Sequence, residues 1–198
     1  MKKSITREQI IETALDLMRD KKDLRSLNLR EIARTLGCAH TNIYNYFSSY
    51  TDLLWETHTA LQEVFMQSLR ENLSAATTAD IKLRHFFNMF LQIYIVNKGW
   101  FRLAWLEYIG DIRPESNKIA IQNTRLELNQ YVIDIWEEIT GITPQTDMVD
   151  RVLHNTHCYI IGEVSNYISG RGLIEDETEL KNYIVSQAIY IFSLYMRG

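Results

Sequence analysis

Apolar side chains recur every three or four positions along most of this chain, and that spacing predicts amphipathic helices. The first such stretch begins at Thr6, which with Gln9 fits a capping box, and it continues to about Met18. Ile10 and Ala14 lie on its apolar face. The N-terminal segment is therefore expected to begin with a capped helix.

Two shorter helices and a long one are predicted next. Asn28 is an N-cap signal for the second helix, and Gly37 ends it because glycine tolerates the left-handed conformation after a helix. A third helix is predicted over about residues 39–47. Ser49 and Asp52 then open a long helix that reaches about Leu73.

Five further helices are predicted beyond Ser74, ending near Gly99, Gly110, Gly141, Ser169 and Met196. The chain contains only 2 prolines and 8 glycines, which fall at predicted helix boundaries except for Gly162. We find no convincing strand. The pattern predicts an all-α protein of about nine helices, three at the N-terminus and six in the remainder.

Composition narrows the class of protein. The 198 residues are 46% hydrophobic and 23% charged, as in an ordinary globular protein. The 2 cysteines, Cys38 and Cys158, cannot form a disulfide framework or a four-thiolate zinc site, which favours a reducing compartment. No stretch has the length and apolarity of a signal peptide core or a membrane span. The sequence therefore predicts a cytoplasmic protein.

The second and third predicted helices, joined through Gly37, form a candidate helix-turn-helix. In the third helix, Ile43 and Phe47 are spaced to point inward. The remaining side chains carry the short donors and acceptors that read base edges and phosphates. These candidates are His40, Thr41, Asn42, Tyr44, Asn45 and Tyr46. The alternative, with Tyr44 and Tyr46 as core aromatics, is less consistent with so many polar groups in eight residues.

The stretch Leu29–Gly37, followed by Ile43–Phe47 and then Leu53-Leu54, resembles the DNA-binding domain of the TetR family of bacterial transcriptional regulators. This motif covers about residues 6–55. The resemblance implies a DNA-binding domain in residues 1–50 and a domain in residues 51–198 that dimerises and usually binds a small molecule.

Two positions depart from the family pattern. Ala39 stands where a serine often caps the recognition helix, so His40 or Thr41 would have to cap it. Tyr50 stands where the family commonly carries a phosphate-binding lysine, and it can donate a hydrogen bond without supplying charge.

Charge is distributed unevenly along the chain. Residues 1–55 hold nine Lys or Arg and seven Asp or Glu, a net charge of +2, and the remainder carries −6, giving −4 overall. Lys2, Lys3 and Arg7 form a basic arm that could reach a groove or phosphates, although a solvated tail is the alternative. The predicted DNA contacts are Lys3, Asn28, Arg30, His40, Thr41, Asn42, Tyr44, Asn45, Tyr46 and Tyr50.

The last two predicted helices are apolar on more than one side. One protomer core cannot cover every side, so a two-fold four-helix interface between two copies is expected. Gly162 inside this region would allow close helix approach. The predicted dimer-interface residues are Ile160, Ile161, Val164, Tyr167, Ile168, Ile184, Ile191 and Tyr195.

The middle of the chain is rich in aromatic residues, which line ligand pockets but also fill ordinary cores. Arg125 lies in an apolar stripe, where it could extend to solvent or pair with Glu107, Asp111 or an acidic ligand. His154 is interpreted as a polar group of the pocket. The predicted ligand-binding residues are Phe86, Phe90, Tyr94, Trp100, Trp105, Tyr108, Arg125, Trp136 and His154.

Catalytic and metal chemistry are not indicated. His154, His157 and Cys158 could supply metal ligands, but we find no fourth ligand in the sequence. There is no glycine-rich phosphate loop, nucleophile elbow or HExxH motif. We therefore expect no enzyme activity, no metal and no cofactor.

The sequence as a whole predicts a homodimeric, ligand-responsive DNA-binding regulator. We expect it to repress from a palindromic operator and to be released by a small apolar or aromatic effector, with the long fourth helix carrying the conformational shift. An activator or a regulator that needs a co-repressor is the alternative within this class. From another class, the alternative is a small-molecule or metal-binding protein whose N-terminal helices are structural.

Overall fold

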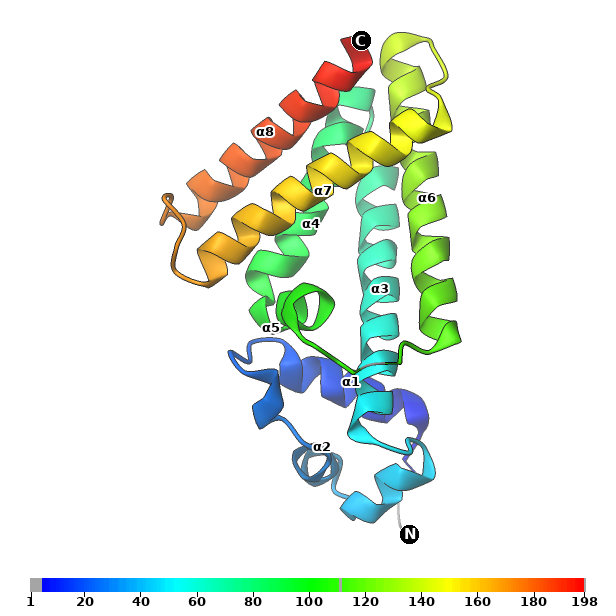
Figure 1. The fold of residues 1–198 in the computed structure, drawn as a ribbon, viewed down its shortest axis with the longest axis vertical. Helices are drawn as coiled ribbons and strands as arrows, with labels where there is room; N and C mark the ends of the chain where they lie inside the picture. The colour runs from blue at the N-terminus through cyan, green and yellow to red at the C-terminus, as the bar shows by residue number, and fades with distance from the viewer. Residues whose placement is uncertain (1–4, 111, 198) are drawn as a thin grey trace. The chain divides into compact units, whose positions relative to one another are not determined.

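The computed structural model describes residues 5–110 and 112–197. These residues form eight α-helices and three short η segments, without a strand (Figure 1). The elements are α1 (Arg7–Met18), η1 (Leu24–Ser26), α2 (Leu29–Leu36), η2 (His40–Asn45), α3 (Tyr50–Ser74), α4 (Ala79–Val96), α5 (Lys98–Phe101), η3 (Arg102–Leu106), α6 (Glu115–Thr140), α7 (Thr146–Ile168) and α8 (Glu177–Arg197). The all-α prediction is confirmed. Its nine helices correspond to these elements if α5 and η3 count as one and η1 is set aside.

Local capping explains where the first helices begin and end. The Thr6 hydroxyl accepts from the Gln9 amide N–H at 3.2 Å, and the Gln9 side chain accepts from the Thr6 amide N–H at 3.1 Å, which completes the predicted capping box. Asn28 Oδ1 accepts the N–H groups of Arg30 and Glu31 at the start of α2. Gly37 ends α2 in the left-handed conformation, with φ of 68°, as predicted for a glycine at this position.

The third predicted helix is a 3₁₀ helix, η2, and is shorter than expected. Ala39 occupies the N-cap position and supplies no side-chain hydrogen bond. The expectation that His40 or Thr41 caps this helix is therefore wrong. Both residues lie inside the first turn, and the cap position itself holds a methyl group, which cannot accept a hydrogen bond.

The chain divides into two compact units. Unit 1 comprises Met1–Val64 and Asn97–Ile121, and unit 2 comprises Phe65–Val96 and Gln122–Gly198. Two of the three divisions fall within α3 and α6, so each of these helices contributes to both units, and the third lies between α4 and α5. These bounds differ from the functional division predicted at residue 50, because unit 1 extends along α3 and also includes α5 and η3.

Unit 1 has a core formed by α1, α2, η2 and the start of α3. Ile10, Ile32, Ile43 and Leu53 are fully buried there. The α5 segment attaches to the end of α1, where Trp100 Nε1 donates to the Leu15 carbonyl at 2.8 Å. The helix-turn-helix is therefore held by contacts from a segment about 60 residues further along the chain.

Unit 2 is built around α4, α7 and α8. Helices α7 and α8 lie side by side, and both contact α4 (Figure 1). Phe87 of α4 packs edge-to-face against Phe192 of α8, with ring centroids 6.0 Å apart, and Trp136 of α6 contacts the same ring. None of the described helices is long and apolar enough to span a lipid bilayer.

Candidate nucleic-acid interface

The exposed side chains of η2 are the strongest functional feature of unit 1. Ile43 and Phe47 are buried, as their spacing predicted, and they fix which side of the element faces the core. The opposite side is exposed. It presents His40, Thr41, Asn42, Tyr44 and Asn45, with Tyr44 53% exposed. Five of the six predicted reading residues are thus brought together on one accessible surface.

Tyr46, the sixth, has a different role. Its side chain is half-buried, and its hydroxyl donates to the backbone carbonyl of Ile5. Tyr46 therefore ties the end of η2 to the segment before α1. Its hydroxyl donor is thereby used within the protein, and a contact of Tyr46 with DNA stays a prediction.

Tyr50, predicted to contact a phosphate, is also directed inward. Its hydroxyl donates to the Leu24 carbonyl at 3.4 Å. Burial, together with the negative charges of Glu107 and Glu31, raises the pKa of Tyr50 to about 12. The phenol therefore stays protonated, and its donor is already used inside the protein.

Asn28 and Arg30 lie at the start of α2, and both are exposed. The Asn28 side-chain oxygen is engaged as the helix cap, so only its amide N–H groups remain for a partner. Arg30 lines an open groove of about 700 Å³ together with His40 and Tyr44. This groove joins the first turn of α2 to the exposed side of η2.

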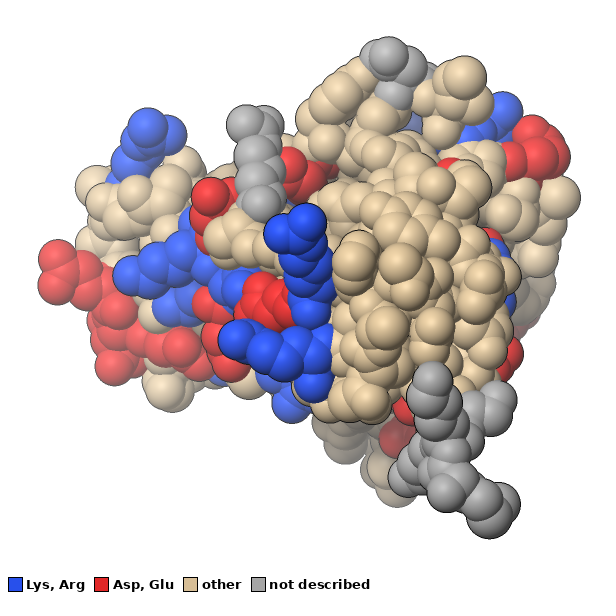
Figure 2. Space-filling model, turned by 90° about the horizontal axis from the view of Figure 1, so that it is seen from below, with Lys and Arg blue, Asp and Glu red and all other residues tan. Residues whose placement is uncertain are grey.

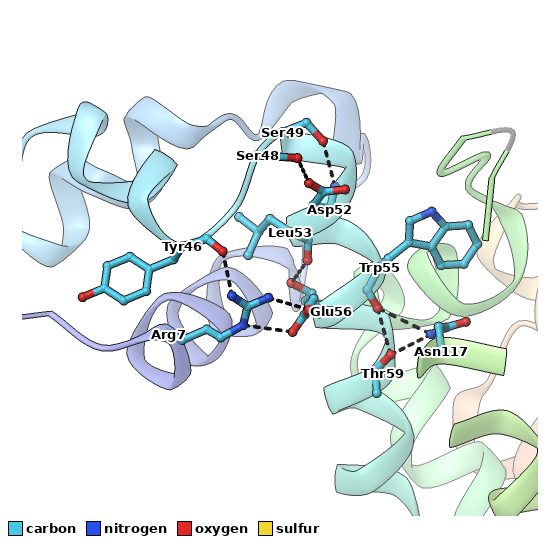
Figure 3. Close-up of polar contacts among 11 residues, drawn as sticks. Arg7, Tyr46, Ser48, Ser49, Asp52, Leu53, Trp55, Glu56, Thr59 and Asn117 are labelled. Atoms are coloured by element: carbon cyan, nitrogen blue, oxygen red, sulfur yellow. Dashed lines mark hydrogen bonds and ion pairs between the residues drawn. The ribbon is translucent and has the colours of Figure 1, made fainter. Parts of the chain in front are cut away.

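Arg7, assigned to a basic arm by the sequence, is instead the centre of a polar network (Figure 3). Its guanidinium donates to Glu56 at 2.6 Å and to the Tyr46 carbonyl at 2.6 Å, and it lies over the Phe47 ring at 4.5 Å. The hydrogen bond that Arg7 donates to the Glu56 carboxylate raises the pKa of Arg7 above its usual value. Arg7 therefore anchors the end of η2 to α1 and α3. Lys2 and Lys3 lie outside the described residues.

A second network in unit 1 joins α3 to the first turn of α6 (Figure 3). Asn117, which is 1% exposed, donates to the Thr59 hydroxyl at 2.7 Å and lies 3.1 Å from His58 Nδ1. Burial and the charge of Arg113 lower the pKa of His58 to about 4. Sequence reasoning missed both networks, since their partners are about 50 to 60 residues apart and follow no local pattern.

The predicted ligand-binding residues do not form a single cluster within one unit. Phe86, Phe90, Tyr94 and Trp136 are buried in unit 2, where Phe90 contacts Phe65 with ring centroids 4.8 Å apart. Trp100, Trp105 and Tyr108 belong to unit 1, and Tyr108 is 67% exposed. The described contacts of the first group are those of an aromatic core, and their role in ligand binding stays a prediction.

Arg125 and His154 also lie differently from expectation. Arg125 is largely exposed and pairs with Asp150 at 2.8 Å, a partner that was not among the alternatives of solvent, Glu107, Asp111 or an acidic ligand. Asp111 lies outside the described residues. His154 is exposed, and its Nε2 lies 3.7 Å from Cys158 Sγ. The neighbouring His157 is partly buried; its ring contacts Phe90, and desolvation lowers its pKa to about 4. No group of three or more potential metal ligands occurs within residues 5–110 and 112–197.

The predicted dimer residues divide into two groups. Ile160, Val164 and Ile184 are at most 1% exposed, so they belong to the core of the protomer and their assignment to the interface is wrong. The other five predicted residues are partly exposed: Ile161, Tyr167, Ile168, Ile191 and Tyr195.

The exposed side of α8 carries large side chains that sequence reasoning did not select. Tyr183, Tyr190 and Leu194 are 44%, 56% and 48% exposed, and they follow one another at helical spacing. On α7, Cys158 and Gly162 are exposed on one face, and a Cβ at Gly162 would meet no atom within 4 Å. The periodicity of α8 was too weak to show which of its apolar sides faces solvent.

Solved structures with the same arrangement of helices identify the fold. A TetR-family transcriptional regulator from Bordetella parapertussis is 19% identical, with 92% of this chain and 93% of that chain covered and a TM-score of 0.66. A TetR-family regulator from Streptomyces coelicolor is 16% identical, with coverages of 96% and 83% and a TM-score of 0.70. The transcriptional regulator FadR from Bacillus subtilis, solved in complex with stearoyl-CoA, is 17% identical, with coverages of 92% and 97% and a TM-score of 0.68. The sequence matches no protein-family model and no curated protein.

These likenesses extend over nearly the whole chain. The protein therefore has the fold of the TetR-family transcriptional regulators, as the resemblance of its N-terminal motif indicated.

Proposed function

We propose that this protein is a DNA-binding transcriptional regulator that acts as a homodimer and responds to a small molecule. The observation that carries the proposal is the exposed polar side of η2. Its side chains are held outward by Ile43 and Phe47, and its C-terminal end is fastened by Arg7. Exposed donors and acceptors on an element whose orientation is fixed by buried anchors are the groups that contact base edges and phosphates.

Dimerisation supplies the second reading element. One short helix contacts too few base pairs for specificity, whereas two helices about 34–36 Å apart read successive major grooves of a palindromic site. We assign the dimer contact to the exposed sides of α7 and α8, which present Gly162, Tyr183, Tyr190 and Leu194. The partly exposed Ile161, Tyr167, Ile168, Ile191 and Tyr195 complete this surface.

The effector proposed is a small apolar or aromatic molecule, and its binding releases the protein from DNA, which makes the protein a repressor. The buried aromatic residues of unit 2 support this chemistry, and so does the stearoyl-CoA complex of the Bacillus subtilis FadR structure. A ligand that prefers the non-binding conformation by about 10⁴-fold is enough to move the protein from mostly bound to mostly released. The α3 helix, which contributes to both units, would carry the shift.

The direct test is binding to the DNA that flanks the gene, measured by fluorescence anisotropy with the purified protein. We expect a complex at nanomolar to submicromolar protein concentration that Asn42→Ala and Tyr44→Ala each weaken about tenfold or more. Arg151→Ala is the control, because Arg151 forms an exposed pair with Asp147 in unit 2. Full affinity in both η2 variants would show that η2 is not the reading element.

The effector is tested by thermal shift over a panel of acyl-CoA thioesters, fatty acids and aromatic acids. A ligand at 100 times its Kd stabilises the protein by about 2.7 kcal/mol. Stabilisation together with loss of the DNA complex identifies an inducer, whereas stabilisation with tighter DNA binding identifies a co-repressor. Ligand binding without any DNA complex would favour a small-molecule-binding protein whose N-terminal helices are structural.

A further inference from the structure

We propose that the protein selects operator half-sites rich in A·T base pairs, and that Asn42 and Asn45 are the residues that specify them. This inference rests on the proposed DNA-binding function and names the kind of sequence that function requires. It depends on which side chains of η2 are exposed, how they are spaced, and where the nearest cations lie.

The exposed side of η2 carries no formal charge. It presents two carboxamides, one hydroxyl, one phenol and one imidazole, and no lysine or arginine occurs between His40 and Asn45. Within the described residues, no intramolecular hydrogen bond holds the side-chain amide of Asn42 or Asn45. Both amides therefore keep a donor and an acceptor for an external partner.

The 3₁₀ geometry of η2 places the two amides together. A 3₁₀ helix has three residues per turn and rises about 2 Å per residue, so residues 42 and 45 lie on one side, roughly 6 Å apart along the axis. Base pairs in B-form DNA are stacked about 3.4 Å apart. Asn42 and Asn45 are thus spaced to contact different base pairs of one half-site.

Carboxamides and cations select different bases. Asn forms a bidentate pair only with adenine. Its Nδ2–H group donates to the N7 acceptor, and its Oδ1 accepts from the N6 amino group, which lies beside N7 in the major groove. Guanine offers two acceptors there, N7 and O6, which suit the two donors of Arg or Lys. A reading side with two Asn and no long cation therefore matches adenine. The Thr41 methyl group, exposed on a neighbouring side of η2, offers an apolar contact to a thymine methyl.

The cations nearest in sequence lie on α2, where Arg30 and Arg34 are exposed one helical turn apart. The first helix of a helix-turn-helix crosses the DNA backbone, so these groups are placed for phosphates and carry no base information. Figure 2 shows an area without acidic or basic side chains on the lower face of Figure 1, bordered on one side by a group of Lys and Arg side chains. The cations of α2 would therefore supply affinity for the DNA backbone, and the neutral side chains of η2 would supply base selectivity.

Neighbouring side chains restrict the orientation of η2. The His40 and Tyr44 rings, both on η2, contact each other edge-on, with centroids 6.5 Å apart. On the opposite side, Phe47 is covered by the Arg7 guanidinium. His40 and Tyr44 can each donate to N7 of either purine, so they add affinity with little discrimination between A·T and G·C.

The test is selection from a random double-stranded library with the full-length protein, followed by affinity measurements on the recovered sites. We expect palindromic half-sites rich in A·T. We expect an A·T to G·C change opposite Asn42 to weaken binding about tenfold. Recovery of half-sites rich in G·C would overturn the assignment of Asn42 and Asn45 to adenine and would leave the proposed DNA-binding function intact. Recovery of no preferred sequence would contradict both the preference for A·T and the proposed sequence-specific binding.

Two variants separate base reading from general affinity. Asn42→Arg should shift the preference toward guanine at one position of each half-site, because it replaces the adenine-matching amide by two donors. Arg34→Ala should weaken binding to all sequences alike and lower the log–log salt slope by about 1 per half-site. Circular dichroism checks that both variants are folded. An Asn42→Arg protein with an unchanged base preference would contradict the role of Asn42.

Discussion

Single residues show most clearly how much the tertiary contacts add to a local pattern. Gly99 was expected only to end a helix, yet its N–H donates to the Arg19 carbonyl at 2.8 Å, and a Cβ there would overlap the carbonyl oxygen of Met18. The absence of a side chain allows α5 to approach the end of α1. Gly162, by contrast, lies within α7 with open space around it.

We expect Gly99→Ala to lower the free energy of unfolding by about 2–3 kcal/mol, because the methyl group must displace backbone rather than a flexible side chain. Asn123→Ala, at an exposed position of α6, is the control, and it should raise the free energy of unfolding by about 0.5 kcal/mol through its higher helix propensity. Urea denaturation at one protein concentration measures both. Equal effects of the two substitutions would show that α5 and α1 do not meet at Gly99.

At the scale of elements, the sequence pattern predicted where the helices begin and end, but it did not predict which helices contact each other. The ends of α1 and α2 follow from Thr6, Asn28 and Gly37, whose capping groups act within three or four residues. The contact between α3 and α6 depends on His58 and Asn117, which are 59 residues apart. No local signal distinguishes such a buried polar pair from ordinary surface residues.

This buried pair predicts a pH dependence of stability. The pKa of His58 in the folded state, about 4, is below its value of about 6.5 in the unfolded chain, so the unfolded state binds the proton more tightly. The contribution of the neutral imidazole is present above pH 6.5 and is lost as the pH falls toward 4. Between pH 7.5 and 5, His58 should account for about 2 kcal/mol of lost stability.

His58→Gln isolates this effect, since glutamine keeps a hydrogen-bonding group but does not titrate. The free energy of unfolding, measured in urea from pH 7.5 to 5, should fall less steeply for this variant than for the parent protein. The remaining slope includes His157, whose pKa is also lowered to about 4. Parallel curves for the two proteins would show that His58 is solvated rather than buried against α6.

At the scale of the whole molecule, function depends on surfaces that must remain uncovered within one protomer. The net charge of −4 hides a basic N-terminal part and an acidic remainder, so DNA is expected to contact only the former. Tyr183, Tyr190 and Leu194 of α8 are exposed, and they form part of the surface that we propose contacts a second copy.

We expect Leu194→Asp to convert the dimer to a monomer, because it introduces a charge into the proposed contact and desolvating that charge is costly. Leu126→Asp is the control, since Leu126 is 60% exposed on α6 in the same unit. Sedimentation equilibrium measures the mass, and anisotropy measures the accompanying loss of specific DNA binding. A monomer in both proteins, or a dimer in both, would place the two-fold contact elsewhere.

The sequence by itself determined the helical class, the capped ends of the first helices and the helix-turn-helix with its inward Ile43 and Phe47, because these follow from periodicity and from contacts within a few residues. It also separated the charge of the two parts of the chain. Only the tertiary structure decided which of the polar residues near the helix-turn-helix are exposed and which are hydrogen-bonded inside the protein. Arg7 and Tyr50 are held by hydrogen bonds inside unit 1, whereas Asn42 and Asn45 are left uncommitted on its surface. Residues distant in sequence determine whether a polar side chain is hydrogen-bonded inside the protein or exposed. The pattern of residues along one helix does not identify those distant partners.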